Sequence, residues 1–167
     1  SYSRWYYAID KDILRVTVFV HAGSPSVSLE AESMSGKKYD MLFTSQLLFG
    51  ENEFTDPVEW AESNGIITIS GQKPDAVETY YPDLCYRVSL KGESWNLSDD
   101  RVLFEDNKPR NGTLLTMEAT GRSHASFTLT GCLYGENEAQ LEADFNTEKE
   151  NCEKAFERLT RGLVLTA

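Results

Sequence analysis

Two histidines and three cysteines are the residues of this chain best suited to act as a catalytic base, a nucleophile or a zinc ligand. His21 and His124 each fall at an expected strand edge or turn, and neither has a cysteine, serine or aspartate at a known motif spacing. Zinc sites use close pairs of such residues, whereas Cys85, Cys132 and Cys152 lie more than four positions from one another and from both histidines. We therefore expect solvated or capping histidines, no catalytic residue and no metal site.

Paired carboxylates are the next groups that could do chemistry. Asp99 with Asp100, and Asp10 with Asp12, could serve acid–base or calcium chemistry, but neither pair lies in an EF-hand pattern. Aspartate is a preferred turn former, so these residues are expected in turns of an acidic surface. The chain also contains no GxxxxGK or GxGxxG phosphate loop. No cofactor is therefore expected, and the chain is expected not to be an enzyme; a hydrolase or lyase built in a barrel mouth is the disfavoured alternative.

The charge balance restricts the partners. A formal net charge of −11 and a pI near 4.6, without clustered Lys and Arg, argue against nucleic acid and anionic membrane surfaces as partners. No run approaches the roughly 20 apolar residues of a membrane helix, and no basic stretch followed by an apolar one opens the chain. A cytoplasmic protein with reduced thiols is expected. The alternative is a secreted protein with one disulfide and with glycosylation at Asn96 or Asn111, both of which lie in acceptor triplets.

Strands are expected to carry most of these residues. From Ile13 to Val20, β-branched residues alternate with polar ones, and the same alternation resumes from Val27 to Ala31 after a Gly-Ser-Pro turn. Further short runs, Val102 to Phe104 among them, bring the expected number to about nine, which is typical of a sandwich or barrel. The predicted fold is therefore mainly β, an antiparallel β-sandwich or barrel with one C-terminal α-helix.

The C-terminal helix is predicted from a change of period. Thr147 and Glu150 have the spacing of a capping box, and Gly162 is placed to end the helix. One helical face would carry Cys152, Ala155, Phe156, Leu159 and Leu163.

The chain length of 167 residues fits one domain, so residues 1–167 are expected to form a single β-rich unit. A similarity between residues 48–53 and residues 133–138 raises an alternative. In that alternative, residues 1–73 form one sandwich, and residues 84–167 form a second, sandwich-like repeat with the helix.

Several short motifs follow one another in a characteristic order across residues 4–73. They are Trp5-Tyr6, Asp12 with the strand 13–20, Val27-x-Leu29-Glu30, Tyr39, Leu47-Leu48-Phe49-Gly50-Glu51, and Gly65 to Ile69 before Lys73. This half resembles the CS domain of the p23 type, an HSP20-like sandwich found in Hsp90 co-chaperones. The family's W-x-R-L-T-K segment is similar to residues 156–161 here. The resemblance implies a β-sandwich that binds a chaperone.

A non-enzymatic protein-interaction module of the Hsp90 co-chaperone kind is the resulting hypothesis, with Hsp90 or a client protein as its partner. Aromatic residues dominate binding hot spots, although in a β-rich fold most of them serve as core or cross-strand pairs. The residues expected to bind the partner are Trp5, Trp60, Trp95, Phe156 and Arg158. The alternative function is a secreted sandwich or barrel that binds a ligand or a partner protein.

Overall fold

Antiparallel strands dominate the computed structural model, which describes residues 2–46, 58–71, 80–91, 94–110, 114–133 and 145–161. The elements of these residues, in chain order, are β1 (Tyr2–Ile9), β2 (Asp12–Val20), β3 (Ser26–Ser33), β4 (Tyr39–Gln46), β5 (Val58–Ser63), β6 (Ile66–Gly71), β7 (Leu84–Lys91), β8 (Asn96–Ser98), the 3₁₀-helix η1 (Asp100–Leu103), β9 (Leu114–Arg122), β10 (His124–Leu133) and α2 (Phe145–Thr160).

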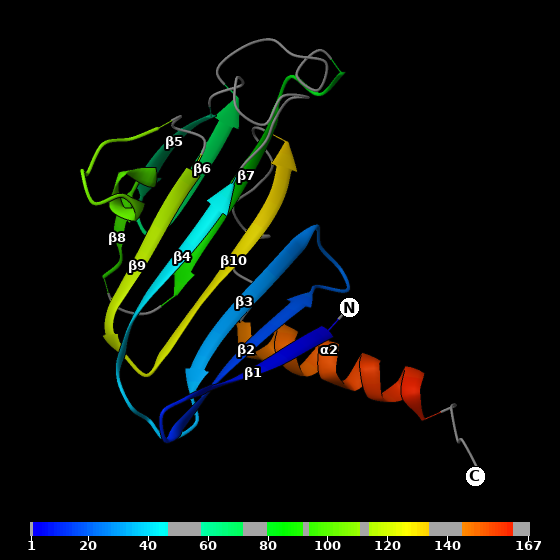
Figure 1. Ribbon diagram of the computed structural model, residues 1–167. Coiled ribbons are helices and arrows are strands. Elements are labelled where there is room, and N and C mark those ends of the chain that lie inside the picture. Colours follow the sequence, from blue (N-terminus) through cyan, green and yellow to red (C-terminus); the bar gives the residue numbers. More distant parts are fainter. Residues whose placement is uncertain are drawn as a thin grey trace.

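The strands form two open sheets (Figure 1). The large sheet has the order β1-β2-β3-β10-β7-β6-β5, and the small sheet has the order β4-β9-β8. All of the pairings are antiparallel. The predicted mainly-β fold is confirmed in its sandwich form, together with the C-terminal helix.

Local predictions fared unevenly. The first predicted hairpin is confirmed, since β2 pairs with β3 and Val20 lies opposite Val27. The strand predicted at 102–104 is wrong, because η1 occupies this segment. Asp99 caps η1 by accepting a hydrogen bond from the backbone N–H of Arg101, which satisfies a donor that a strand would have used in a ladder.

The main core lies between the two sheets. Ile67, Ile69 and Val88 of the large sheet pack against Leu115 and Met117 of β9. A smaller cluster joins Ala31 and Ala125 of the large sheet to Met41 and Ala119 of the small one. Each fully buried aliphatic side chain contributes roughly 1.5–3 kcal/mol. Because one face of each sheet borders this apolar layer, apolar and polar residues alternate along the strands.

Helix α2 lies on the opposite face of the large sheet, over β1 and β2 (Figure 1). Ala31 belongs to the inter-sheet core, whereas its neighbour Glu30 is bonded to Lys149 of the helix, so successive side chains of β3 point to opposite layers. Phe145 and Cys152 are the buried residues of α2. No helix in the described ranges combines the length and apolar character needed to cross a bilayer.

The start and the buried face of the helix differ from the prediction. The helix begins at Phe145, two residues before the expected cap at Thr147. Phe156 and Leu159, expected on the buried face, are 49% and 77% exposed. Gly162 and Leu163 lie outside the described residues.

The large sheet draws strands from both halves of the chain, because β10 lies between β3 and β7. Of the segments compared as a repeat, only Leu133 lies within the described residues. This topology favours a single unit, and the single-domain interpretation stays a prediction.

Candidate functional site

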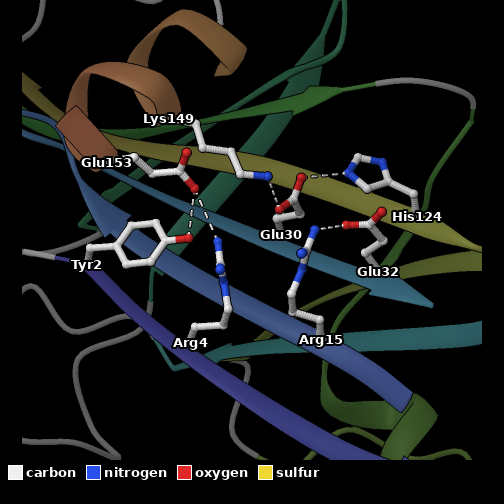
Figure 2. Close-up of polar contacts among 8 residues, drawn as sticks. All are labelled: Tyr2, Arg4, Arg15, Glu30, Glu32, His124, Lys149 and Glu153. Atoms are coloured by element: carbon white, nitrogen blue, oxygen red, sulfur yellow. Dashed lines mark hydrogen bonds and ion pairs between the residues drawn. The ribbon is translucent and has the colours of Figure 1, made fainter. Parts of the chain in front are cut away.

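A polar layer lies between α2 and the large sheet, where charged side chains of the helix and of the strands form several ion pairs (Figure 2). The layer exists because the strand residues that alternate with the core residues are polar here, while the helix above carries carboxylates and a lysine. We define the polar layer by its members, Tyr2, Arg4, Arg15, Glu30, Glu32, His124, Lys149 and Glu153.

Glu30 lies at the centre of the polar layer and is only 4% exposed. Nζ of Lys149 donates to its Oε2, and Nε2 of His124 lies 3.0 Å from its Oε1 (Figure 2). Burial alone would raise the pKa of the carboxyl group, but the contacts with His124 and Lys149 more than offset burial and lower the pKa to about 2. Glu30 is therefore an ionised, fully partnered carboxylate that ties β3, β10 and α2 together.

Two further ion pairs extend the polar layer toward the sheet edge. Nη2 of Arg4 lies 3.2 Å from Oε1 of Glu153, and the Tyr2 hydroxyl donates to the same oxygen at 3.0 Å. Arg15 pairs with Glu32 across β2 and β3. Arginine is suited to this position because its planar head can bond a carboxylate while its stem packs on the sheet.

A histidine, a serine and a carboxylate lie in the order found in hydrolytic triads. Nε2 of His21 is 2.8 Å from Oγ of Ser28, and its Nδ1 is 3.7 Å from Oε2 of Glu148. Ser28 is completely buried, however, and its hydroxyl also bonds Oγ1 of Thr128 at 2.7 Å. The Ser28 hydroxyl is thus enclosed between His21 and Thr128, and His21 connects it to Glu148 of α2, an arrangement that suits a structural contact better than a nucleophile.

Burial also governs the charge of His21. The ring is stacked on Phe19 at a centroid distance of 5.4 Å. Burial lowers the pKa of His21, and the charge of Glu148 opposes that shift only in part. The expectation that His21 is solvated is therefore wrong, because α2 covers a strand end that the sequence alone leaves open.

A second polar cluster surrounds Asp12 at the start of β2. Its carboxylate accepts from the Ser33 hydroxyl at 2.7 Å, from the Tyr39 hydroxyl at 2.9 Å and from the Ser35 backbone N–H at 3.1 Å. The hydrogen bond from Ser33 is the largest cause that holds the pKa of Asp12 well below its usual range, and burial opposes it. The surface turn expected at Asp12 is instead a buried junction that fixes the crossover from β3 to β4.

Neither cluster resembles a metal site, since the described residues contain no group of three or more His, Cys, Asp or Glu side chains placed to hold a metal ion. The Asp99 carboxylate accepts hydrogen bonds from the Arg101 guanidinium at 2.7 Å, and Asp100 is buried. Asp99 with Asp100 thus shapes η1, and Asp10 lies in the left-handed region at φ 54° in the turn before β2.

The five residues expected to bind a partner do not form one surface. Trp5 lies on edge strand β1 and is 46% exposed, while Trp60 lies on β5 at the other edge of the large sheet. Trp95 is half-buried against Phe43, with ring centroids 5.7 Å apart. Phe156 and Arg158 are exposed on α2, on the face of the large sheet opposite the small sheet. A partner-binding role for these residues stays a prediction.

Sequence reasoning did not identify the polar layer, because its members come from β1, β2, β3, β10 and α2 and share no local motif. The one available signal was that β2 and β3 carry charges at alternate positions, namely Arg15, Glu30 and Glu32. Charged residues at alternate positions are usual on a solvated sheet face. Here the packing of α2 on the sheet covers part of that face.

Comparison with known proteins identifies relatives of another kind. A family model described as "Glycoside phosphorylase supersandwich domain" matches residues 1–131. A 1,2-β-oligoglucan phosphorylase from Listeria innocua is 29% identical over 106 residues, which cover 64% of this chain and 10% of that protein. The chain thus corresponds to about a tenth of the length of this relative.

These matches overturn the co-chaperone interpretation. The resemblance to a CS or p23-like domain is wrong, and so are the chaperone function drawn from it and the expectation that the chain is not an enzyme, because the matching family belongs to glycoside phosphorylases. A protein partner stays a prediction. The quoted motifs were strings of strand residues, which any half-buried antiparallel sheet requires. The segment 156–161, compared with the family's tail, belongs mostly to α2.

Proposed function

This chain belongs to the glycoside phosphorylase supersandwich domain family, and we propose that it serves as the supersandwich domain of an enzyme that cleaves 1,2-β-linked oligoglucans with inorganic phosphate. Its role there is to support the part of the enzyme that holds the reacting groups. The observation that carries the proposal is the family match over residues 1–131. The substrate class comes from the name of the Listeria innocua relative.

The ionisation of the buried carboxyl groups favours a structural role for this domain over a catalytic one. Cleavage of a glycosidic bond requires a carboxyl group that is protonated at the working pH, so that it can donate to the leaving oxygen. Glu30, with its pKa lowered to about 2, is ionised at neutral pH, and the hydrogen bond from Ser33, with others, holds the pKa of Asp12 well below its usual range. Neither carboxyl group can serve as that acid.

The cations of the polar layer are committed as well. A phosphate co-substrate would need basic side chains free to bind its oxygens. Arg4 pairs with Glu153, Arg15 pairs with Glu32, and Lys149 pairs with Glu30. The Arg4–Glu153 and Lys149–Glu30 pairs join α2 to the sheet, and the Arg15–Glu32 pair joins β2 to β3, so each of these cations already faces a carboxylate.

A domain exchange tests the proposal. The segment of the Listeria innocua phosphorylase that aligns with this chain is replaced by the chain, and phosphate-dependent cleavage of 1,2-β-oligoglucan is measured. We expect the chimera to retain cleavage and this chain alone to show none with the same substrate and phosphate. Cleavage by the chain alone, or a folded chimera without cleavage, would contradict the supporting role.

A further inference from the structure

Two cysteines face each other on the neighbouring inner strands β7 and β10 of the large sheet, near one end of each strand. Cys85 of β7 is the direct register partner of Cys132 of β10. Their Sγ atoms are 3.1 Å apart, and no disulfide joins them. Neither cysteine belongs to the polar layer, and the proposed function assigns no role to either of them.

The backbone already has the spacing that a disulfide needs. Directly opposed residues of an antiparallel pair have Cα atoms about 4.5–5.5 Å apart. That interval lies within the roughly 4.4–6.8 Å seen across disulfides. The sulfurs need to approach by about 1 Å to reach the usual S–S bond length of about 2.05 Å, which side-chain rotation can supply without a change of strand register.

We propose that Cys85 and Cys132 are a modification site, at which a low-molecular-weight disulfide such as oxidised glutathione converts the two thiols into an intrachain disulfide. Cys132 is partly exposed, whereas Cys85 is 1% exposed, so Cys132 reacts first. The inference is independent of the glycan assignment, because it rests only on strand pairing and thiol chemistry.

The reaction balances as two thiol–disulfide exchanges. The Cys132 thiolate attacks one sulfur of oxidised glutathione, which breaks the glutathione S–S bond and releases one glutathione thiolate. The Cys85 thiolate then attacks the Cys132 sulfur of the mixed disulfide and releases the second. The protons of the two protein thiols pass through solvent to the two glutathiones. Two electrons leave the cysteine pair, and one oxidised glutathione becomes two reduced ones.

The third cysteine does not compete for this bond. Cys152 lies in α2, where it is buried and its Sγ donates to the backbone carbonyl of Val20 at 3.7 Å. The odd cysteine count thus divides into one facing pair and one thiol beneath the helix. Cys152→Ser is the matched control, because it removes a buried thiol without touching the pair.

The position of the pair gives the bond a measurable effect. β10 is the middle strand of seven, and β7 joins it to β6 and β5. A bond between residues 47 positions apart closes a long loop of the unfolded chain, which lowers the entropy of that state. We expect the melting temperature of the oxidised protein to rise by roughly 5–10 °C.

The experiment uses the fully reduced chain, treated with oxidised glutathione, blocked with an alkylating agent and digested with trypsin. The three cysteines fall on separate tryptic peptides, because Arg87, Arg122, Lys149 and Lys154 bound them. We expect a Cys85–Cys132 linked peptide, an alkylated Cys152 peptide and the higher melting temperature. Dithiothreitol should return both signals to those of the reduced protein.

Variants keep the result interpretable. Cys132→Ser, at a partly exposed position, should fold and should lose both the linked peptide and the temperature gain, whereas Cys152→Ser should retain both. If Cys132→Ser misfolds, the proposal is still tested in Cys152→Ser by the presence of the linked peptide and by its loss after dithiothreitol treatment. Glutathione that remains on Cys132, a link to Cys152, or links only between chains would overturn the proposal.

Discussion

Glu30 is a carboxylate that the fold has removed from water and placed between Lys149 and His124. Replacing it with glutamine keeps its shape but leaves Lys149 largely buried without a counter-charge. We expect Glu30→Gln to lower the free energy of unfolding by about 2–4 kcal/mol, measured by urea denaturation. Glu32→Gln is the matched control, because Glu32 lies on the same face of β3 with a side chain 35% exposed, and it should cost about 1 kcal/mol or less. Equal losses would contradict the central role of Glu30.

The lowered pKa of Glu30 adds a pH dependence. A carboxyl group whose pKa falls on folding stabilises the folded state at pH values above its unfolded pKa, near 4.5, and that stabilisation is lost as the pH falls toward about 2. We expect wild-type stability to fall across this interval and Glu30→Gln to flatten part of the decline. The check is a series of urea denaturation curves from pH 5 to pH 2, which is roughly the interval that the two pKa values define. An unchanged slope in the variant would contradict the assignment.

Asp12 and Tyr39 form a coupled pair at the sheet crossover. Burial first, then the hydrogen bond and the negative charge of Asp12, raise the pKa of Tyr39. We expect Asp12→Asn to bring the pKa of Tyr39 back toward its ordinary value while burial keeps it above that value. Ultraviolet titration of tyrosinate, with Tyr39→Phe to identify the signal, measures the change. A Tyr39 pKa that does not fall in Asp12→Asn would show that the carboxylate does not act on the phenol.

For individual residues, the sequence shows which side chains can ionise but not whether they are buried in the fold. Asp12 and Glu30 look like surface positions, because each lies in a polar turn or in a strand's polar alternation. Their burial depends on side chains from segments distant in the chain, namely Tyr39 for Asp12 and Lys149 for Glu30. Local patterns carry no record of such contacts.

Helix α2 is held at its first turns. Phe145 packs edge-on against Phe19, with ring centroids 5.3 Å apart, and is 7% exposed. We expect Phe145→Ala to cost about 3 kcal/mol locally and to speed amide hydrogen exchange in α2 while exchange in β9 stays slow. Leu159→Ala, at an exposed position of the same helix, should leave both unchanged. Equal effects of the two substitutions would contradict attachment through the N-terminal turns.

The existence of this helix was predictable, but its attachment was not. A period near 3.6 over the last part of the chain indicates a helix whatever it contacts. The predicted buried face assumed that Phe156 and Leu159 would meet an apolar sheet face. The sheet face presented to α2 is polar apart from Phe19 and a few neighbours, so ion pairs and the ring of Phe145 decide which helical face turns inward.

The sandwich as a whole depends on the inter-sheet core. Met117 of β9 is 1% exposed and contacts the large sheet, so Met117→Ala should lower the melting temperature by about 6–12 °C. If the described strands form one unit, far-ultraviolet circular dichroism and tryptophan fluorescence should report one coincident transition. Leu42→Ala, at an exposed position of β4, should change little. Two separate transitions would favour the two-unit alternative.

At this scale, strand patterning predicted the fold class, and it could not predict the order of strands. The alternation along β2 and β3 requires a partner layer and a turn, which is why their hairpin was predictable. The insertion of β10 between β3 and β7 depends on pairings such as Ser26 with Thr130, and no short-range signal encodes them. The enzyme family was likewise not predicted, because no short motif of the sequence pointed to it.

The central place of β10 also has a consequence during synthesis on the ribosome. β3 emerges early, yet its partner strand arrives late, since Ser26 and Thr130 are 104 positions apart. At translation rates of about 5–20 residues per second, the inner edge of β3 waits roughly 5–20 s for β10. During that interval this edge is unpaired while β2 covers the other one, and an unpaired strand edge can pair with another nascent chain. Crowded polysomes and slowed elongation should therefore favour aggregation of this protein more than they would a sandwich whose central strand is made first.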